Sequence, residues 1–308
     1  METSDICVAH LVRARNGIEP LEQFLASYDR YRGGIDHDLL FILKGFAGDK
    51  VDPPTDAILN RYRHLRMFTP DWGYDVTAYF RAVKGHAHPV FCLLNSFSEI
   101  LADDWLLQLH RAFSLPGVGV AGATGSYQGY REDWKHLPKS SEFAMRSQWK
   151  EILLKLPLVD RLSALRHRLL FASFPNPHIR TNGMMLKREL MLSLTPQVTL
   201  TKMRAYKFES GKHGMTTQIL ALGKKVLIVG RDGAIYDIPE WRESNIFWKG
   251  DQQNLLIADN QTRRYEAADM ETRKIFSWWA WGTDREHAQR TARETARATV
   301  DAQEFVTR

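Results

Sequence analysis

Residues 89–106 read PVFCLLNSFSEILADDWL, and this stretch decides the fold. Its first part, 89–94, is an apolar run of strand length, which predicts a buried strand. Polar residues follow at once, and Asp103 and Asp104 then open a helix whose positive N-terminal end suits carboxylates. A strand that passes through a polar edge into a helix is the repeating unit of a mostly parallel α/β sheet.

The same alternation runs through the first 125 residues. Strands are predicted at 6–12, 39–43, 64–68 and 118–123, and helices at 20–31, 56–62 and 75–84. Ligands of doubly wound sheets bind beyond the carboxyl ends of the strands. Candidate site residues therefore follow the strands, at Arg13, Lys44, 69–75, 95–99 and 124–125.

The alternation of strands and helices stops between residues 126 and 177, where a basic amphipathic stretch predicts a helical insertion. It resumes with HIRTNGMMLKRELMLSL, a strand and a helix, and continues to about residue 240. We therefore predict one domain over 1–240, with an insertion at 126–177, and a C-terminal helical extension over 241–308. Trp278, Trp279 and Trp281 of that extension are expected to be core or a dimer contact, because clustered tryptophans usually bury area.

Composition narrows the function class. The 42 Lys and Arg against 36 Asp and Glu leave a charge of +6, but these residues are scattered and form no nucleic-acid-binding motif. Cys7 and Cys92 lie in apolar runs, which predicts two buried thiols and a reducing, cytoplasmic setting. The N-terminus does not resemble a signal peptide, and no run approaches the roughly 20 apolar residues of a membrane span.

Asn95, Ser96, Ser98 and Glu99 carry a resemblance to a known family. A buried strand that ends in such residues and runs into a helix near Trp105 resembles the GT-A fold of inverting, family 2-like glycosyltransferases. In that family a D-x-D-like motif stands here and holds a divalent metal on the sugar-nucleotide diphosphate. Neither Asp is present in this chain, so the resemblance implies Mg²⁺ or Mn²⁺ only through Glu99. The alternative is that these residues merely cap the next helix.

The resemblance also implies a nucleotide-sugar site at the ends of the earlier strands. Arg13 and Asn16 follow the first strand, and the guanidinium suits a phosphate or a base edge. Lys44 follows the second strand. Asp71 and Asp75 stand where related enzymes contact the base or ribose, although a turn and an N-cap explain them equally well.

Two further segments resemble the acceptor side of such enzymes. Arg180 and Asn182 precede Gly183, which permits close backbone approach, and are expected in the cleft. Arg231 and Asp232 follow the last core strand and either close the cleft or only form a turn.

Glu209 is the predicted general base. In inverting GT-A enzymes an acidic residue at the start of the helix after the acceptor loop takes the proton of the acceptor hydroxyl, and Glu209 is the matching acid. Ser210, Gly211 and Lys212 would then supply N–H groups and a cation near the leaving diphosphate, with His213 as the runner-up base. The alternative is that Glu209 and Ser210 cap the helix at 216–222.

These features predict a glycosyltransferase that uses a nucleotide-sugar donor and a glycan or lipid-linked acceptor, in cell-surface polysaccharide or lipopolysaccharide synthesis by analogy. Two alternatives stay open: a degenerate GT-A domain that binds without turnover, and a nucleotidyltransferase. Residues 143–172 interleave leucines with basic residues, which suits either a peripheral contact with the inner face of the cytoplasmic membrane or a helical lid. A homo-oligomer is compatible with the Trp-rich tail.

Overall fold

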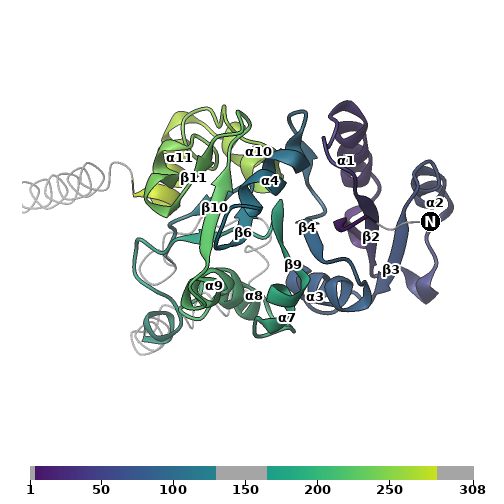
Figure 1. Cartoon of the computed structure of the whole chain (residues 1–308), viewed down its shortest axis with the longest axis horizontal. Coiled ribbons are helices and arrows are strands. Elements are labelled where there is room, and N and C mark those ends of the chain that lie inside the picture. Colours follow the sequence, from purple (N-terminus) through teal and green to yellow (C-terminus); the bar gives the residue numbers. More distant parts are fainter. Residues whose placement is uncertain (1–3, 130–164, 283–308) are drawn as a thin grey trace, which may run out of the picture.

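The computed structural model describes residues 4–129 and 165–282. Its centre is an eight-stranded sheet of order β11-β10-β6-β9-β4-β1-β2-β3 (Figure 1). The strands are β1 (Ile6–Arg13), β2 (Asp38–Lys44), β3 (Leu65–Thr69), β4 (Val90–Leu94), β6 (Val118–Gly122), β9 (Met184–Lys187), β10 (Lys225–Val229) and β11 (Ile235–Tyr236). Only β9 and β11 run antiparallel to their neighbours in this sheet. The predicted mostly parallel sheet is therefore confirmed.

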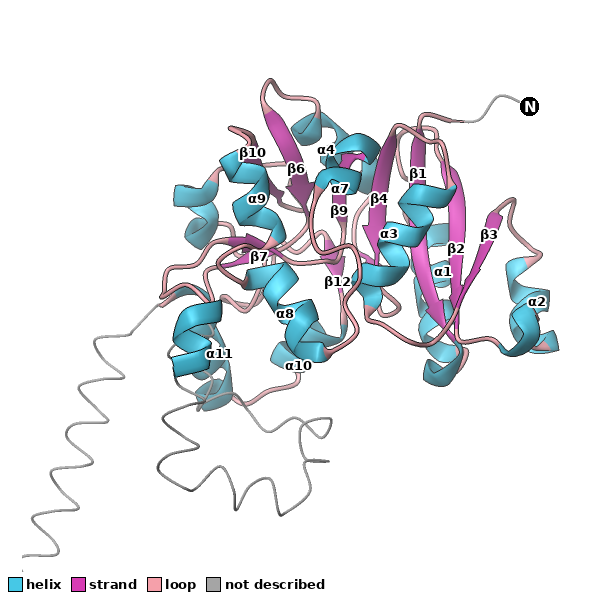
Figure 2. Ribbon diagram, turned by 90° about the horizontal axis from the view of Figure 1, so that it is seen from below, coloured by secondary structure: helices cyan, strands magenta, loops and turns pink. Residues whose placement is uncertain are grey.

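Helices cover both faces of the sheet (Figures 1 and 2). One face carries α1 (Glu19–Arg30), α2 (Pro53–Leu59) and α4 (Trp105–Phe113), and the other α3 (Asp75–Gly85), α7 (Arg188–Ser193), α8 (Lys202–Ser210) and α9 (Met215–Ala221). Each face buries its own apolar cluster, because the helices present apolar residues at helical spacing. In α1 these are Leu21, Phe24 and Leu25.

The C-terminal part packs onto this sheet. Its elements are the 3₁₀ helix η4 (Ile238–Glu243), β12 (Ile257–Ala258), α10 (Asn260–Glu266) and α11 (Met270–Trp281). Strand β12 pairs with β5 (Glu99–Ile100), and Trp241, Trp279 and Trp281 are buried in the same cluster as α3 and β4. The predicted core role of the tryptophans is thus observed for Trp279 and Trp281. Residues 283–308 lie outside the described residues.

The sequence placed two helix starts wrongly. Helix α2 begins at Pro53 rather than residue 56, because the Asp52 side chain accepts the Thr55 N–H and proline suits a first turn. Helix α4 begins at Trp105, and Asp104 is left-handed with no capping bond. Asp103 instead accepts a hydrogen bond from the backbone N–H of Arg32.

The predicted insertion is described only at its ends. Strand β7 (Gly125–Ser126) pairs antiparallel with β8 (His178–Ile179), so the residues that flank the insertion meet in a short two-stranded sheet. Residues 165–170 are helical. Residues 143–164 of the basic stretch at 143–172 lie outside the described residues.

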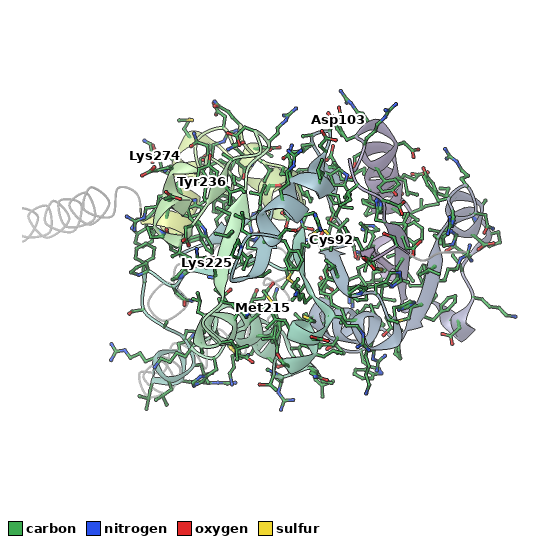
Figure 3. All side chains as sticks on the ribbon, in the orientation of Figure 1. Cys92, Asp103, Met215, Lys225, Tyr236 and Lys274 are labelled. Atoms are coloured by element: carbon green, nitrogen blue, oxygen red, sulfur yellow. The ribbon has the colours of Figure 1, made fainter. Side chains whose placement is uncertain are left out.

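The two cysteines are buried and free, as predicted. Cys7 lies in β1 and Cys92 in β4, two neighbouring strands at the centre of the sheet. Figure 3 shows Cys92 deep inside the ribbon, whereas Asp103 and Lys274 lie at its outline. Among the described residues, no helix combines the length and the apolar character that a membrane span needs.

Candidate functional site

The carboxyl ends of β1, β2, β3 and β4 lie at one edge of the sheet, because these four strands are parallel. Figure 2 shows them side by side. The predicted residues Arg13, Lys44 and Asn95 close or follow these strands. They fall into two groups, one around Arg13 and one beyond β4.

The first group, named here the outer cluster, comprises Arg13, Lys44, Asp71 and Asp75. The Arg13 Nε donates to Asp71 Oδ1 at 2.7 Å, and the two side chains are 22% and 48% exposed. Lys44 is buried, and its ammonium donates to the carbonyl oxygen of Gly73. Asp75 begins α3 as predicted. The loop that carries Asp71 therefore folds back over the ends of β1 and β2.

Gly45 shows why this loop can approach. Its φ of 78° is left-handed, and a Cβ there would meet the Asp71 Cβ at 3.0 Å. The charges in the outer cluster act on one another. Burial lowers the pKa of Lys44, and the nearby carboxylate of Asp75 opposes that shift. Burial raises the pKa of Asp71, but the hydrogen bond and charge of Arg13 outweigh it, so the net pKa is lowered.

Trp72 is an exposed aromatic residue of this edge that the sequence reasoning did not assign. It is 49% exposed, and the guanidinium carbon of Arg81 lies 4.1 Å from its ring centre. Arg81 also donates to Thr69 Oγ1 at 2.8 Å. The neighbouring Pro70, Asp71 and Gly73 predict a turn, but a turn sequence does not fix the direction of the tryptophan side chain.

Asn16 and Ser96 lie beside the outer cluster. Asn16 ends the 3₁₀ helix η1 (Ala14–Asn16), and together with Arg13 and Ser96 it lines a crevice with no room for a water molecule. Ser96 is itself buried. The structure therefore brings these three predicted residues together.

Asn182 joins the end of β4 to the C-terminal part of the chain. Its Oδ1 accepts from the Asn95 N–H at 3.2 Å and from Ser98 Oγ at 2.6 Å. Its Nδ2 donates to the carbonyl oxygen of Ala258 at 3.4 Å. Because Ser98 and Asn182 are fully buried, they support the site from beneath.

Arg180 and Asp259 form a buried ion pair above Asn182. Arg180 Nη2 lies 3.0 Å from Asp259 Oδ2, and the two side chains are only 17% and 1% exposed. The same carboxylate oxygen accepts from Asn95 Nδ2 at 3.4 Å. The guanidinium carbon lies 4.1 Å from the ring centre of Phe247. Arg180 Nη1 is buried with no hydrogen-bond partner among the described residues.

Asp259 is a residue of this site that the sequence did not predict. Its Oδ1 accepts from the N–H groups of Gln261 and Thr262, so it is the N-cap of α10. The DNQT pattern predicts such a cap. Nothing in the local sequence indicates that the second carboxylate oxygen faces Arg180, 79 residues away.

Glu209 completes what we name the inner cluster: Arg180, Thr181, Asn182, Glu209 and Asp259. Its Oε1 accepts a hydrogen bond from Thr181 Oγ1. Burial raises the pKa of Glu209, the Thr181 hydroxyl and the Arg180 charge act against that shift, and Asp75 adds to it. The carboxylate is therefore partly desolvated and close enough to Asp75 to feel its charge.

Tyr79 also belongs to this region, although the sequence did not single it out. It is buried in α3, one turn beyond Asp75, and its hydroxyl donates to the Thr181 carbonyl oxygen at 3.3 Å. Burial raises the pKa of Tyr79 well above its ordinary value, and Asp75 and Glu209 add to the shift. Tyr79 thus lies between the outer and inner clusters as a neutral hydroxyl.

The backbone around Glu209 differs from the prediction. Glu209 lies in the last turn of α8, not at the start of a helix, and Gly214 is the N-cap of α9. Ser210 is buried. The N–H groups of Gly211 and Lys212 are already donated to the carbonyl oxygens of Lys207 and Leu170, so they are not free for a diphosphate.

The remaining predicted cleft residues stay outside the inner cluster. Lys212 and His213 are exposed. Arg231 and Asp232 form an exposed turn after β10, in which both backbone N–H groups donate to Asn254. Here the structure matches the simple turn that the sequence left open.

Glu99 does not offer a metal site. Its carboxylate lies 2.9 Å from Arg263 Nη1, in an ion pair that also ties Arg263 to the Phe97 carbonyl oxygen. Within residues 4–129 and 165–282, no three His, Cys, Asp or Glu side chains converge to hold a metal ion. The described residues therefore form no complete set of protein ligands, and Glu99, the one carboxylate that the GT-A resemblance implies, is held by Arg263 instead of standing free for Mg²⁺ or Mn²⁺.

No family model matches the sequence. No curated protein matches it either. Solved structures do resemble the chain, at low similarity. A mannosyltransferase from Pyrobaculum calidifontis in complex with GDP-Man and Mn²⁺ shares 12% identity over 80% of this chain and 61% of its own, with a TM-score of 0.43. The chain thus spans less than two thirds of that protein.

Two others match over 38% of this chain. GalNAc-T7 with UDP, GalNAc and Mn²⁺ shares 14% identity over 22% of its own chain, with a TM-score of 0.30. TarS of S. aureus shares 11% over 21% of its own chain, with a TM-score of 0.31. At these values the likenesses say nothing of the substrate of this chain. The fold prediction is confirmed by the strand order itself, a mostly parallel sheet with helices on both faces.

The arrangement can support a proton transfer next to a positive charge. Glu209 is a carboxylate with a raised pKa, and Arg180 of the same cluster has one buried nitrogen, Nη1, without a hydrogen-bond partner among the described residues. The outer cluster adds an open ion pair and an exposed indole. A base beside a cation suits a reaction in which a hydroxyl loses a proton while an anionic group leaves.

Proposed function

We propose that this chain is a glycosyltransferase that moves a sugar from a nucleotide-sugar donor to an acceptor hydroxyl, with Glu209 as the general base. The observation that carries the proposal is the Glu209 carboxylate, whose pKa is raised by burial and whose position is held by Thr181 beside Arg180. A base whose pKa lies nearer neutrality takes a proton more readily than an ordinary carboxylate.

In the proposed reaction the acceptor oxygen attacks the anomeric carbon of the donor sugar. A new carbon–oxygen bond forms to the acceptor, and the bond to the diphosphate breaks, with its electron pair leaving on the diphosphate. The hydroxyl proton passes to Glu209. A single displacement of this kind inverts the anomeric centre.

The outer cluster supports binding of the nucleotide part. Asp71 is exposed and Arg13 is partly exposed, so both can contact phosphate, ribose or base, and the exposed Trp72 ring suits stacking on a base. Lys44 and Ser98 are buried, so we assign them to holding the loops in place. Arg180 Nη1 is proposed to stabilise the leaving diphosphate. No step is assigned to a metal ion, because Glu99, the predicted ligand, is paired with Arg263.

The same geometry favours one competing function, the binding of a sugar-nucleotide without turnover. Glu99 and Asp259 are each paired with an arginine, so neither carboxylate is free to take the part of the D-x-D aspartates that the GT-A resemblance implies. Polysaccharide or lipopolysaccharide synthesis, with a glycan or lipid-linked acceptor, remains the proposed setting by analogy.

The first test is a thermal-shift screen against UDP, GDP, dTDP and CMP and their sugar conjugates, with and without Mg²⁺ or Mn²⁺. A bound donor at a hundredfold excess over its Kd stabilises the fold by about 2.7 kcal/mol. One nucleotide that raises the midpoint would identify the donor base. If none does, the sugar-nucleotide proposal fails in both its catalytic and non-catalytic forms.

The second test is Glu209→Gln with the donor so identified. We expect unchanged donor affinity and a fall in kcat of about 10²- to 10⁴-fold in transfer or donor hydrolysis, because the variant cannot accept the proton. The acidic limb of the wild-type kcat profile should lie above the ordinary glutamate pKa of about 4.3. Glu22→Gln, an exposed acid of α1, is the matched control. Full turnover by Glu209→Gln would contradict the assigned base.

A further inference from the structure

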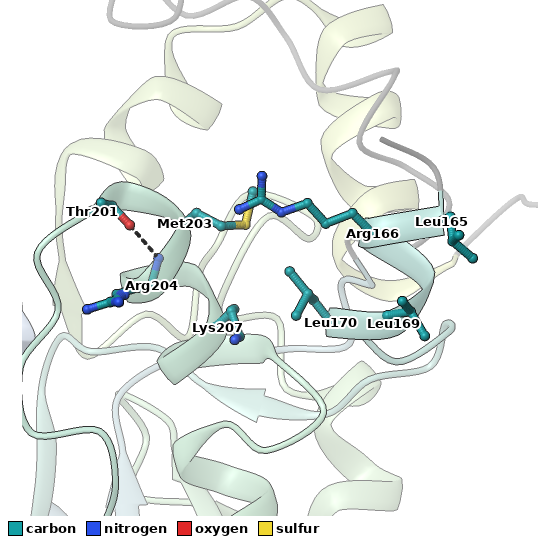
Figure 4. Close-up of a pocket in the computed structure, with 8 residues that line it drawn as sticks. All are labelled: Leu165, Arg166, Leu169, Leu170, Thr201, Met203, Arg204 and Lys207. Atoms are coloured by element: carbon teal, nitrogen blue, oxygen red, sulfur yellow. Dashed lines mark hydrogen bonds between the residues drawn. The ribbon is translucent and has the colours of Figure 1, made fainter. Parts of the chain in front are cut away.

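A groove lies between the helical residues 165–170 and α8 (Figure 4). Its volume is about 540 Å³. Its lining consists of Leu165, Arg166, Leu169, Leu170, Thr201, Met203, Arg204 and Lys207. We name it the cationic groove. It is separate from the outer and inner clusters, since none of its lining residues belongs to either.

The charge of the cationic groove has one sign. Arg166, Arg204 and Lys207 line it, all three are exposed, and none of the described residues that line it is acidic. In Figure 4 the Arg166 side chain reaches across the groove toward Met203. Three cations without a carboxylate in the lining complement an anionic surface.

Exposed leucines accompany these cations. Leu165 is 53% and Leu169 64% exposed, and they are four residues apart on one helix, so they share a face. Leu200, which precedes the N-cap residue Thr201 of α8, is 53% exposed. Apolar side chains that project beside Lys and Arg are typical of surfaces that lie on anionic bilayers.

Helix α8 connects the cationic groove to the inner cluster. Helix α8 carries Arg204 and Lys207 on the groove and Glu209 in its last turn. From Thr201 to Glu209 the helix rises by roughly 12 Å at 1.5 Å per residue. The Lys212 N–H donates to the Leu170 carbonyl oxygen at 3.0 Å, which links the segment after α8 to the helix at 165–170.

We propose that the cationic groove is a docking surface for an anionic phospholipid bilayer. The cations contact acidic headgroups, and Leu165, Leu169 and Leu200 enter the interface. The bilayer would then lie about two helical turns from Glu209, which suits an acceptor presented at a membrane. Docking itself does not depend on glycosyl transfer.

The test is co-sedimentation of the full chain with vesicles of phosphatidylcholine, with and without phosphatidylglycerol. We expect binding to the acidic vesicles that weakens as salt rises. Arg204→Glu with Lys207→Glu should weaken it at least about tenfold, because each basic residue near an anionic surface contributes about 1 kcal/mol. Leu165→Ser with Leu169→Ser should also weaken it, with the charge unchanged.

The control is Lys84→Glu with Arg111→Glu, which makes the same charge change at exposed positions of α3 and α4. Thermal unfolding of each variant separates lost docking from lost folding. Undiminished sedimentation of the Arg204 and Lys207 variant, or equal binding to both vesicle types, would overturn the proposal. A wild-type chain that binds neither vesicle would also overturn it and would leave an acidic protein as the occupant.

Discussion

The ion pairs of the two clusters differ mainly in their carboxylates: Asp71 of the outer pair is 48% exposed and Asp259 of the inner pair 1%, while their partners Arg13 and Arg180 are 22% and 17% exposed. The chemical group is the same in both, a guanidinium on a carboxylate. Water screens the outer pair, so its strength depends on the solvent. The inner pair is surrounded by Phe247 and Asn95 in place of water, so each charge is stabilised mainly by the other.

This difference suggests a division of work. An open pair can exchange its internal contact for a ligand at little cost, which suits the recognition of a nucleotide. A buried pair is costly to break, which suits a fixed charge beside a reacting centre. Removing one carboxylate from each cluster tests the comparison directly.

The largest expected effect comes from Asp259→Asn. Asparagine keeps the shape of the side chain and can still cap α10, but it leaves the Arg180 charge without its counterion. We expect the free energy of unfolding to fall by about 3–5 kcal/mol, the usual cost of breaking a buried pair. Urea denaturation at neutral pH measures it.

Asp71→Asn is the matched control. Its pair with Arg13 is exposed, so the same chemical change should cost about 1 kcal/mol or less. Equal costs at the two positions would show that burial does not distinguish the clusters. A small cost for Asp259→Asn alone would mean that Arg180 finds another partner.

The outer cluster was largely predictable from the sequence. Arg13, Lys44 and Asp75 each stand directly at the end of a strand or the start of a helix that local periodicity predicts. Parallel strands bring such residues to one edge without further information. Trp72 is the exception, because its exposure depends on the exact course of a turn.

For the inner cluster, the sequence predicted individual residues but not the contacts between them. Glu209, Arg180 and Asn182 were selected by resemblance, but their contacts join segments far apart in the chain, such as Ser98 with Asn182 and Asn95 with Asp259. The local sequence around Asp259 predicts only a helix cap. The contacts of Asp259 with Arg180 and Asn95 form only when the C-terminal part folds onto β4. The sequence also predicted Glu209 at the start of a helix, whereas it lies in the last turn of α8.

A smaller effect should appear in the pH dependence of stability at Glu209. Burial raises its folded-state pKa, so the folded chain holds this proton more tightly than the unfolded chain does. The stability from the protonated form is present below the unfolded pKa and is lost as pH rises through the folded pKa. Glu209→Gln should therefore gain stability relative to wild type as pH rises through this window.

Urea midpoints of wild type and Glu209→Gln between about pH 4 and 8 measure this gap. Glu22→Gln should follow the wild-type curve, because that side chain is exposed. If the gap stays constant over the whole range, the Glu209 pKa is not raised by folding. The inner cluster would then lack the desolvated base on which the proposed reaction depends.

The smallest effect should come from Ser98→Ala, which tests whether buried links without charge also stabilise the inner cluster. Ser98 Oγ lies 2.6 Å from Asn182 Oδ1, and both side chains are buried. Its removal leaves that oxygen with only the Asn95 N–H at 3.2 Å, so we expect a loss of about 1 kcal/mol in urea unfolding. Ser114→Ala, at the exposed end of α4, makes the same chemical change and should shift stability by less than about 0.5 kcal/mol. Asn182 keeps the Asn95 N–H and the Ala258 carbonyl oxygen as partners, so a silent Ser98→Ala would mean that these two contacts suffice to hold it. The Ser98 hydroxyl would then add nothing measurable to the stability of the inner cluster.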